Sequence, residues 1–335
     1  MLALLALLAA LGAGLLWWSY EQFLRSPLAT GAEPVTYPVA AGTGVAQTLR
    51  AMEREGLLAY DWRWRLLLRL EPVTIQAGRY EIPPHTRPRE LLALLASGRV
   101  VQYRFTLVEG WNYRQLRAAL LAEERLATAP EQLDFDQVMV QLGREPGSPE
   151  GWFMPETYAY TDGETALHVL ERALSAQEQL LEHVWQGRQD GLPVNSPYEL
   201  LTLASIVEKE SALGAERPDI AGVFVRRLQQ GWRLETDPTV IYGMGEAYDG
   251  NIRRRDLRAD TAWNTYVHRG LPPTPIAMPG PDALAAAAQP AAGSAMFFVA
   301  DGTGGHVFSE TLAEHNVAVR DLIRRQRAAN KNDSP

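Results

Sequence analysis

The clearest candidates for chemistry are two glutamates, Glu208 and Glu210, in the stretch LASIVEKES (residues 203–211), which otherwise indicates a buried helix. On a helix that turns by about 100° per residue, Glu210 extends the apolar stripe of Leu203 and Ile206. Glu208 is rotated by roughly 160° from Glu210 and points largely away from that stripe. A carboxylate at the edge of an apolar face loses hydration, which raises its pKa. Glu210 is therefore the better candidate for a general acid.

A purely structural role for Glu210 is also open on position alone. An acidic residue in the last turn of a helix can pair with a nearby base, and the sequence offers Lys209, Arg217, Arg226 and Arg227. Structural ion pairs also perturb pKa values. The position of Glu210 therefore does not by itself decide between catalysis and stability.

The helix that carries both glutamates has a clear predicted beginning. Ser196 can cap it, Pro197 suits the first helical position, and Glu199 stands where a glutamate completes a capping box. From there the helix is expected to run to about Ala212 and to stop near Gly214.

Polar and aromatic residues that follow this helix have the composition of a sugar-binding groove. An extended polar run is followed by an apolar segment, which we predict to be a strand, and later by the proline-rich loop GLPPTPIAMPG. Sugar hydroxyls need hydrogen bonds, and pyranose faces need flat apolar surfaces. The candidate substrate-binding residues are Glu235, Thr236, Asp237, Tyr242, Asn264 and Tyr266. Loop caps and core aromatics would have the same composition, so both interpretations stay open.

The first 20 residues, MLALLALLAALGAGLLWWSY, carry no charged side chain. This is about the length that a helix needs to cross a bilayer. Trp17, Trp18 and Tyr20 at its end are typical of the headgroup layer. A cleaved signal peptide is the alternative, but the apolar run is long for one and lacks a convincing A-x-A site. We predict an uncleaved transmembrane anchor over 1–20, whose orientation the flanking charges do not fix.

The remainder of the chain predicts an α+β fold in two parts, a small module over 35–100 and a larger mixed domain over 101–335, after a polar linker over 21–34. In the module we expect strands in TYPVAAGTG and IQAGRYEI and helices in VAQTLRAMEREGLL, DWRWRLLLRL and TRPRELLALLASG. The larger domain should contain a strand–turn–helix in VQYRFTLVEGWNYRQLRAALL, a helix in GETALHVLERALSAQEQLLEHVWQG, a hairpin in MFFVADGTGGHVFS and a last helix in AEHNVAVRDLIRRQRAANKN.

Composition excludes several classes of protein. The chain has 335 residues, of which 46% are hydrophobic and 21% charged, as expected of a globular protein. Its net charge of −8 argues against a nucleic-acid partner, because a phosphate binder needs a basic face. The absence of cysteine excludes thiol catalysis and disulfides. No HExxH pair, GxxxxGK[ST] loop or GxSxG elbow occurs, so we expect neither a zincin, a nucleotide-binding protein nor a common serine hydrolase.

Five segments in a fixed order carry a resemblance to a known family: ASIVEKES, LETDPTVIYGMG, TAWNTY, GLPPTPIAMPG and FFVADGTGGHVF. Together they are similar to the bacterial endolytic murein transglycosylases, the YceG-like family. The resemblance covers nearly the whole chain. It implies a single-pass inner-membrane protein whose periplasmic part cuts nascent peptidoglycan strands, with a LysM-like module over 35–100 and a YceG-like catalytic domain over 101–335. Penicillin-binding synthases are partners expected for the family.

The resemblance also implies roles for particular residues. The catalytic glutamate of the family is the second of its EKE[ST] motif, which corresponds to Glu210, and Glu208 is then structural. The chain departs from the family at Glu235, Trp263 and Thr274, where glutamine, tyrosine and glycine are common. The implied reaction needs one acid and no cofactor, because the C6 hydroxyl of muramic acid is the nucleophile and closes a 1,6-anhydro ring.

Two alternatives remain open from the sequence. A hydrolytic muramidase would use Glu210 as the acid and Glu235 as the base on a water molecule. A non-catalytic scaffold would bind glycan through the LysM-like module and recruit synthases. The mass of the products distinguishes a muramidase from a lytic transglycosylase. A Glu210→Gln substitution distinguishes a scaffold from an enzyme.

Overall fold

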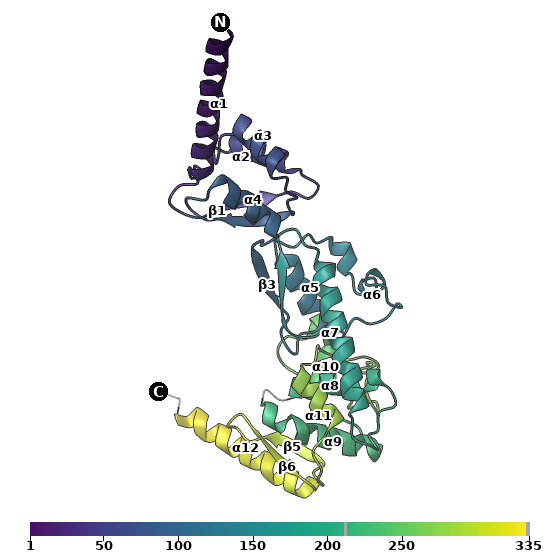
Figure 1. Cartoon of the computed structure of the whole chain (residues 1–335). Helices are drawn as coiled ribbons and strands as arrows, with labels where there is room; N and C mark the ends of the chain where they lie inside the picture. Colours follow the sequence, from purple (N-terminus) through teal and green to yellow (C-terminus); the bar gives the residue numbers. More distant parts are fainter. Residues whose placement is uncertain (211–212, 333–335) are drawn as a thin grey trace. The chain divides into compact units, whose positions relative to one another are not determined.

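The computed structural model describes residues 1–210 and 213–332 (Figure 1). The described chain is mixed α+β, as predicted, and its strands form two-stranded sheets. It divides into two compact units. The first comprises residues 1–104 and 159–164, and the second comprises the rest of the described chain.

Helix α1 (Leu2–Arg25) is, within the described residues, the one helix long and apolar enough to cross a membrane. Its side chains are mostly exposed from Ala3 to Trp18, whereas Tyr20 and Phe23 are buried against the rest of the first unit. The ring of Phe23 meets that of Trp64 edge-on at 5.2 Å. The helix thus continues through Arg25, five residues into the stretch expected to be a linker. Tyr20 belongs to a protein core and not to a belt of exposed aromatic residues.

The first unit contains every strand and helix that the sequence predicts for the small module. Its elements after α1 are β1 (Val35–Val39), α2 (Val45–Arg54), α3 (Trp62–Leu70), β2 (Gly78–Ile82) and α4 (Pro88–Ser97). Strands β1 and β2 pair antiparallel. Helix α4 begins with a proline and ends before Gly98, whose φ of 67° suits a residue without a side chain. The core packs around Trp64, which is fully buried.

The second unit is built mainly of helices. Strands β3 (Gln102–Thr106) and β4 (Thr157–Thr161) pair with each other, and the division between the units falls within both strands. Its helices are α5 (Tyr113–Ala122), α6 (Val138–Gln141), α7 (Ala166–Gln186), α8 (Pro197–Glu210), α9 (Arg217–Gln229), α10 (Asp237–Met244), α11 (Pro281–Ala288) and α12 (Leu312–Asn332). Short 3-10 turns lie at Pro130–Leu133, Gly214–Glu216, Gly245–Ala247 and Asp256–Arg258.

Helix α8, which carries both glutamates, lies at the centre of this unit and packs against α7, α9, α10 and α11. Its cap is the predicted one, since the hydroxyl oxygen of Ser196 accepts a hydrogen bond from the N–H of Glu199 at 3.2 Å. Residues from Leu200 to Glu208 are all buried. The helix is therefore buried all round and has no single apolar stripe, so the helical wheel does not separate the two glutamates. Its expected end at Ala212 lies outside the described residues.

Two elements differ from the sequence prediction. The apolar segment around Tyr242 is helix α10 and not a strand, with Asp237 and Pro238 in its first turn. Both residues favour a helix start, whereas a short apolar run alone fits a buried strand equally well. Helix α11 was not predicted at all. Its alanine-rich sequence lacks an apolar–polar period because α11 is buried against α8 and α9.

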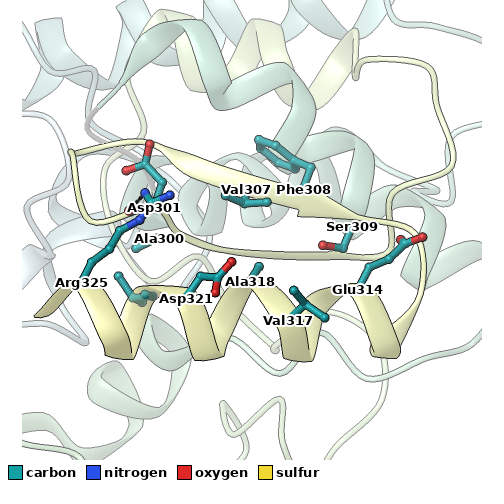
Figure 2. A pocket seen from close by; sticks show the side chains of 11 residues that line it. Ala300, Asp301, Val307, Phe308, Ser309, Glu314, Val317, Ala318, Asp321 and Arg325 are labelled. Carbon is teal, nitrogen blue, oxygen red and sulfur yellow. Dashed lines mark hydrogen bonds between the residues drawn. The ribbon is translucent and has the colours of Figure 1, made fainter. Parts of the chain in front are cut away.

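The predicted hairpin is present near the end of the chain. Strands β5 (Phe297–Ala300) and β6 (His306–Ser309) pair antiparallel, and α12 lies along them (Figure 2). A cavity of about 390 Å³ separates the hairpin from the helix, and Val307, Val317 and Leu322 are among the residues that line it. The guanidinium of Arg325 closes one end of it by donating to the carbonyl oxygen of Asp301 at 2.9 Å. The predicted site residues lie elsewhere in the second unit.

Candidate active site

The candidate site is built around Glu210 at the last described residue of α8. Its side chain is half-buried, and the hydroxyl of Thr236 donates a hydrogen bond to its Oε1. Thr236 is itself fixed, because its N–H donates to the hydroxyl oxygen of Thr265 at 3.1 Å and its carbonyl accepts from the Thr239 hydroxyl at 2.7 Å. The segment before α10 therefore places a rigid donor against one oxygen of the Glu210 carboxyl group.

The surroundings of Glu210 favour its protonated form. Burial is the main cause and raises the pKa of Glu210 to about 7, while the hydrogen bond from Thr236 opposes that rise. The negative charge of Asp237 raises this pKa further, and the positive charges of His306 and Arg227 lower it. Near neutral pH the group is thus divided between acid and base, as a residue that must donate and then recover a proton requires.

Glu208, two residues earlier, has a different environment. One of its oxygens accepts a hydrogen bond from the Arg217 guanidinium at 2.8 Å, and the other accepts from the N–H of Gly280 at 3.0 Å. Both charged side chains of this pair are almost completely buried. Glu208 thus ties α8 to α9 and to the segment that begins α11. Arg217, one of the bases available to Glu210 on sequence grounds, is the partner of Glu208.

Four of the predicted substrate-binding residues surround Glu210. Besides Thr236, the exposed Asp237 accepts a hydrogen bond from the Tyr266 hydroxyl at 2.7 Å. Burial and the hydrogen bond to Asp237 raise the pKa of Tyr266, and the charges of Glu210 and Glu235 raise it further. Glu235 is exposed, with a φ of 52° that is uncommon for a residue with a side chain. These residues offer carboxylate and hydroxyl groups beside the acid.

Asn264 does not belong to the substrate-facing surface. It is completely buried, and its amide nitrogen donates to the carbonyl oxygens of Asp256 at 3.2 Å and Ala259 at 2.7 Å. Its amide oxygen accepts from the N–H of Tyr266 at 2.9 Å. Its hydrogen-bonding groups are thus used within the protein, and a contact with substrate stays a prediction that these bonds do not favour. It positions the backbone at Tyr266 instead.

Tyr242 and Glu150 form a second buried acidic group that sequence reasoning missed. Glu150 is only 2% exposed. Both of its oxygens accept the N–H of Tyr113 at 3.0 Å, and one accepts the Tyr242 hydroxyl at 3.1 Å. Burial raises the pKa of Glu150 to about 7, against the effect of these hydrogen bonds. This glutamate begins the aromatic loop EGWFMPETYAY, which is the sequence feature that could have drawn attention to it. The neighbouring residues in the sequence do not indicate that Tyr113 and Tyr242 are the partners of Glu150.

A cavity of about 560 Å³ in the second unit has Tyr242 of α10 in its wall. Lys209 and Pro238, the sequence neighbours of Glu210 and Asp237, also line it. Of the predicted site residues, Tyr242 lines this cavity, and Glu210 and Asp237 are sequence neighbours of lining residues. Among residues 1–210 and 213–332, no three His, Asp or Glu side chains are grouped so that they could hold a metal ion.

A half-buried carboxyl group that titrates near neutral pH, flanked by carboxylates and hydroxyls, is typical of an enzyme that works by proton transfer. The sequence profile of the YceG-like family matches residues 37–321. The chain therefore belongs to the YceG-like family, and the resemblance seen in its motifs is confirmed.

Related proteins and a solved structure agree with this assignment. The chain is 28% identical over 323 residues to the endolytic murein transglycosylase of Bacillus subtilis, covering 91% of this chain and 89% of that protein. It is 27% identical to the protein of the same name from Streptococcus pneumoniae, covering 92% of this chain but 61% of that longer protein. A crystal structure of a YceG-like protein from Listeria monocytogenes aligns with a TM-score of 0.55 and 25% identity, covering 85% of this chain and 98% of the other.

Proposed function

We propose that this protein is a lytic transglycosylase that cuts within murein glycan strands and leaves 1,6-anhydro-N-acetylmuramic acid ends. The observation that carries the proposal is the position of Glu210, which keeps a proton near neutral pH while Thr236 holds one of its oxygens. The names of the Bacillus and Streptococcus relatives support the same reaction class. Cutting inside nascent strands would end their elongation.

In the proposed reaction, protonated Glu210 gives its proton to the oxygen that joins N-acetylmuramic acid to N-acetylglucosamine. The bond between that oxygen and C1 breaks, and positive charge develops on the muramyl ring. The Glu210 carboxylate then takes the proton of the muramyl C6 hydroxyl, and the C6 oxygen bonds to C1. The residue ends the cycle protonated, and no water is consumed.

The hydrogen bond from Thr236 suits both halves of this cycle. Because the hydroxyl donates to Oε1, the catalytic proton is carried by Oε2. A pKa of about 7 makes the carboxyl group acidic enough to donate and its carboxylate basic enough to recover the proton. We assign substrate contacts to the groups at its side, the exposed Glu235 and Asp237 and the half-buried Tyr266.

The remaining assignments follow from the same proposal. Helix α1 would be an uncleaved single-pass anchor in the inner membrane, with the catalytic part in the periplasm. Its mostly exposed portion, residues 3–18, spans about 24 Å at about 1.5 Å per residue, close to the roughly 30 Å of a bilayer core. Residues 35–100 would form a LysM-like glycan-binding module. Penicillin-binding synthases are the proposed protein partners.

The mass of the digestion products tests the proposal. Purified glycan strands are incubated with the full chain in detergent, and the new ends are measured by mass spectrometry. The lytic reaction adds no mass per cut, whereas hydrolysis adds one water. We expect anhydro ends with the wild-type protein and none with Glu210→Gln. A folded Glu210→Gln protein that still restores normal strand length in a null strain would instead support the scaffold function.

One observation favours hydrolysis as a second candidate function. Glu235 is an exposed carboxylate next to Thr236 in sequence, at a position where the resemblance predicts glutamine. Its N–H donates to the carbonyl oxygen of Thr265 at 3.2 Å, which holds its backbone in the left-handed region. Such a carboxylate can activate water. Hydrated ends that become anhydro ends in Glu235→Gln would establish this muramidase activity.

A further inference from the structure

The cavity that Lys209 and Tyr242 line is suited to negative charge. We infer that it binds the carboxylates of a peptide stem attached to the muramic acid next to the scissile bond. This inference rests on the proposed function, because it assigns to one cavity a branch of the murein strand. With a volume of about 560 Å³, the cavity lies in the range of about 300–1,000 Å³ that ligand pockets occupy.

Two helices contribute both a residue of the proposed site and a residue that lines the cavity. Lys209 precedes Glu210 on α8, and Pro238 follows Asp237 on α10. Lys209 and Glu210 are consecutive residues of α8, so the cavity and the proposed acid share the end of one helix. We place the side branch of a sugar bound at Glu210 in this cavity.

Two cationic side chains line the cavity, Lys209 and Arg114. The Lys209 ammonium donates to the carbonyl oxygen of Gly110 at 3.1 Å, which fixes it and leaves it further N–H groups for a ligand. The acidic residue of the lining, Glu246, is 88% exposed and lies 3.6 Å from Arg114, so the pair is a weak surface contact. A bound carboxylate would compete well for that guanidinium.

Two amides add further donors. The side-chain oxygen of Asn112 accepts the N–H of Gln115 at 2.9 Å, and the side-chain oxygen of Gln115 accepts the N–H of Asn112 at 3.0 Å. This reciprocal cap of α5 uses the acceptor end of both amides. The cap does not use the NH₂ group of either amide, so both groups can donate to a ligand in the cavity. A lining of cations and amide donors selects an acceptor with negative charge, and stem-peptide carboxylates are such groups.

The test compares two matched substrates: murein strands with free stem-peptide carboxylates, and the same strands with these carboxylates converted to amides. The full chain in detergent is assayed on both for kcat/KM. We expect the wild-type protein to prefer the acidic strands by about tenfold, equivalent to 1.4 kcal/mol. Arg114→Gln and Lys209→Gln should each lose most of this preference.

Arg324→Gln is the matched control, since this arginine lies on α12 with its side chain 78% exposed, and it should keep the preference. Wild-type protein that cuts both substrates equally would overturn the cavity assignment and leave the proposed function intact. So would Arg114→Gln and Lys209→Gln proteins that lose the same factor on both substrates. A wild-type protein that cuts neither substrate would overturn the proposed function and this inference together.

Discussion

The two compact units bury different kinds of side chain. In the first unit, tyrosines aside, the buried polar residues among those described are Thr30, Thr48 and Thr86. The second unit buries charged residues as well: Glu150, Glu208, Arg217 and Arg227. Burying a charge costs free energy unless partners replace the lost water. The second unit therefore buries charged groups at a cost in free energy. Such burial is expected near a functional site, where a carboxyl group must hold a proton near pH 7.

An ion pair from each unit makes the contrast specific. In the first unit, the Arg89 guanidinium meets the Glu71 carboxylate at 2.5 Å, and both side chains are about half exposed. In the second, Arg217 meets Glu208 at 2.8 Å, with both side chains below 10% exposure. Water can replace the partner in the first pair but not in the second. Similar distances therefore predict very different effects of substitution.

The largest expected effect is on activity. Glu210→Gln removes the proposed acid and should lower the rate of strand cleavage by about 10²–10⁴-fold, the usual contribution of acid–base catalysis. Glu71→Gln in the first unit is the matched control and should leave the rate unchanged. Both rates are measured by release of soluble fragments from labelled murein. Residual Glu210→Gln activity within tenfold of wild type would remove Glu210 from the chemistry.

The next effect is on stability. Glu208→Ala leaves Arg217 buried without its nearest partner and should destabilise α8 by about 3 kcal/mol, because breaking a buried pair is costly. Glu71→Ala should cost less than about 1 kcal/mol, as is usual for exposed pairs. Hydrogen exchange of the α8 and α4 segments reports the two effects separately. Equal losses in the two units would show that burial does not distinguish the pairs.

The burial of Glu150 should make the free energy of unfolding depend on pH. Its pKa is raised from 4.5 to about 7 by burial, so its stabilising contribution is complete below pH 4.5 and is lost as the pH rises through 7. Glu150→Gln carries no charge at any pH. Relative to wild type, it should therefore gain roughly 3 kcal/mol in unfolding free energy between pH 4.5 and pH 8. A constant difference across this range, measured by denaturation at each pH, would show that Glu150 ionises normally.

The smallest effect is on the pH dependence of the reaction. The Thr236 hydroxyl lowers the pKa of Glu210, so Thr236→Val should raise it and move the alkaline limb of activity to higher pH. The rate below that limb should fall by roughly three- to tenfold, the effect of one lost hydrogen bond. Asp237→Asn removes a charge that raises the same pKa and should move the limb the other way. Shifts of the same sign would contradict the electrostatics of the site.

The sequence predicts local structure better than it predicts partners. The helices and strands of the first unit follow from caps, prolines and spacing, which act within a few residues. Thr236, Asp237 and Tyr266 were chosen as site residues from composition, and the structure brings them to Glu210. Asn264 was chosen on the same ground, yet it is buried and its side chain forms hydrogen bonds within the protein. Type and spacing do not reveal which side of a loop faces the protein.

Contacts distant in sequence could not be predicted from it. Tyr242 and Glu150 are 92 residues apart in the chain and meet through one hydrogen bond. The choice between Glu208 and Glu210 was also made on an assumption that the structure corrects, since α8 is buried on all sides. What separates the two glutamates is their partners. Glu208 has a buried arginine, and Glu210 has a hydroxyl donor.

The pH dependence of kcat/KM for the wild-type protein tests a proton on Glu210 most directly, because this parameter reports the ionisation of the free enzyme. Activity should fall on the alkaline side as one group with an apparent pKa of about 7 loses its proton. Activity that stays constant from about pH 5 to about pH 9 would contradict a proton held and donated by Glu210.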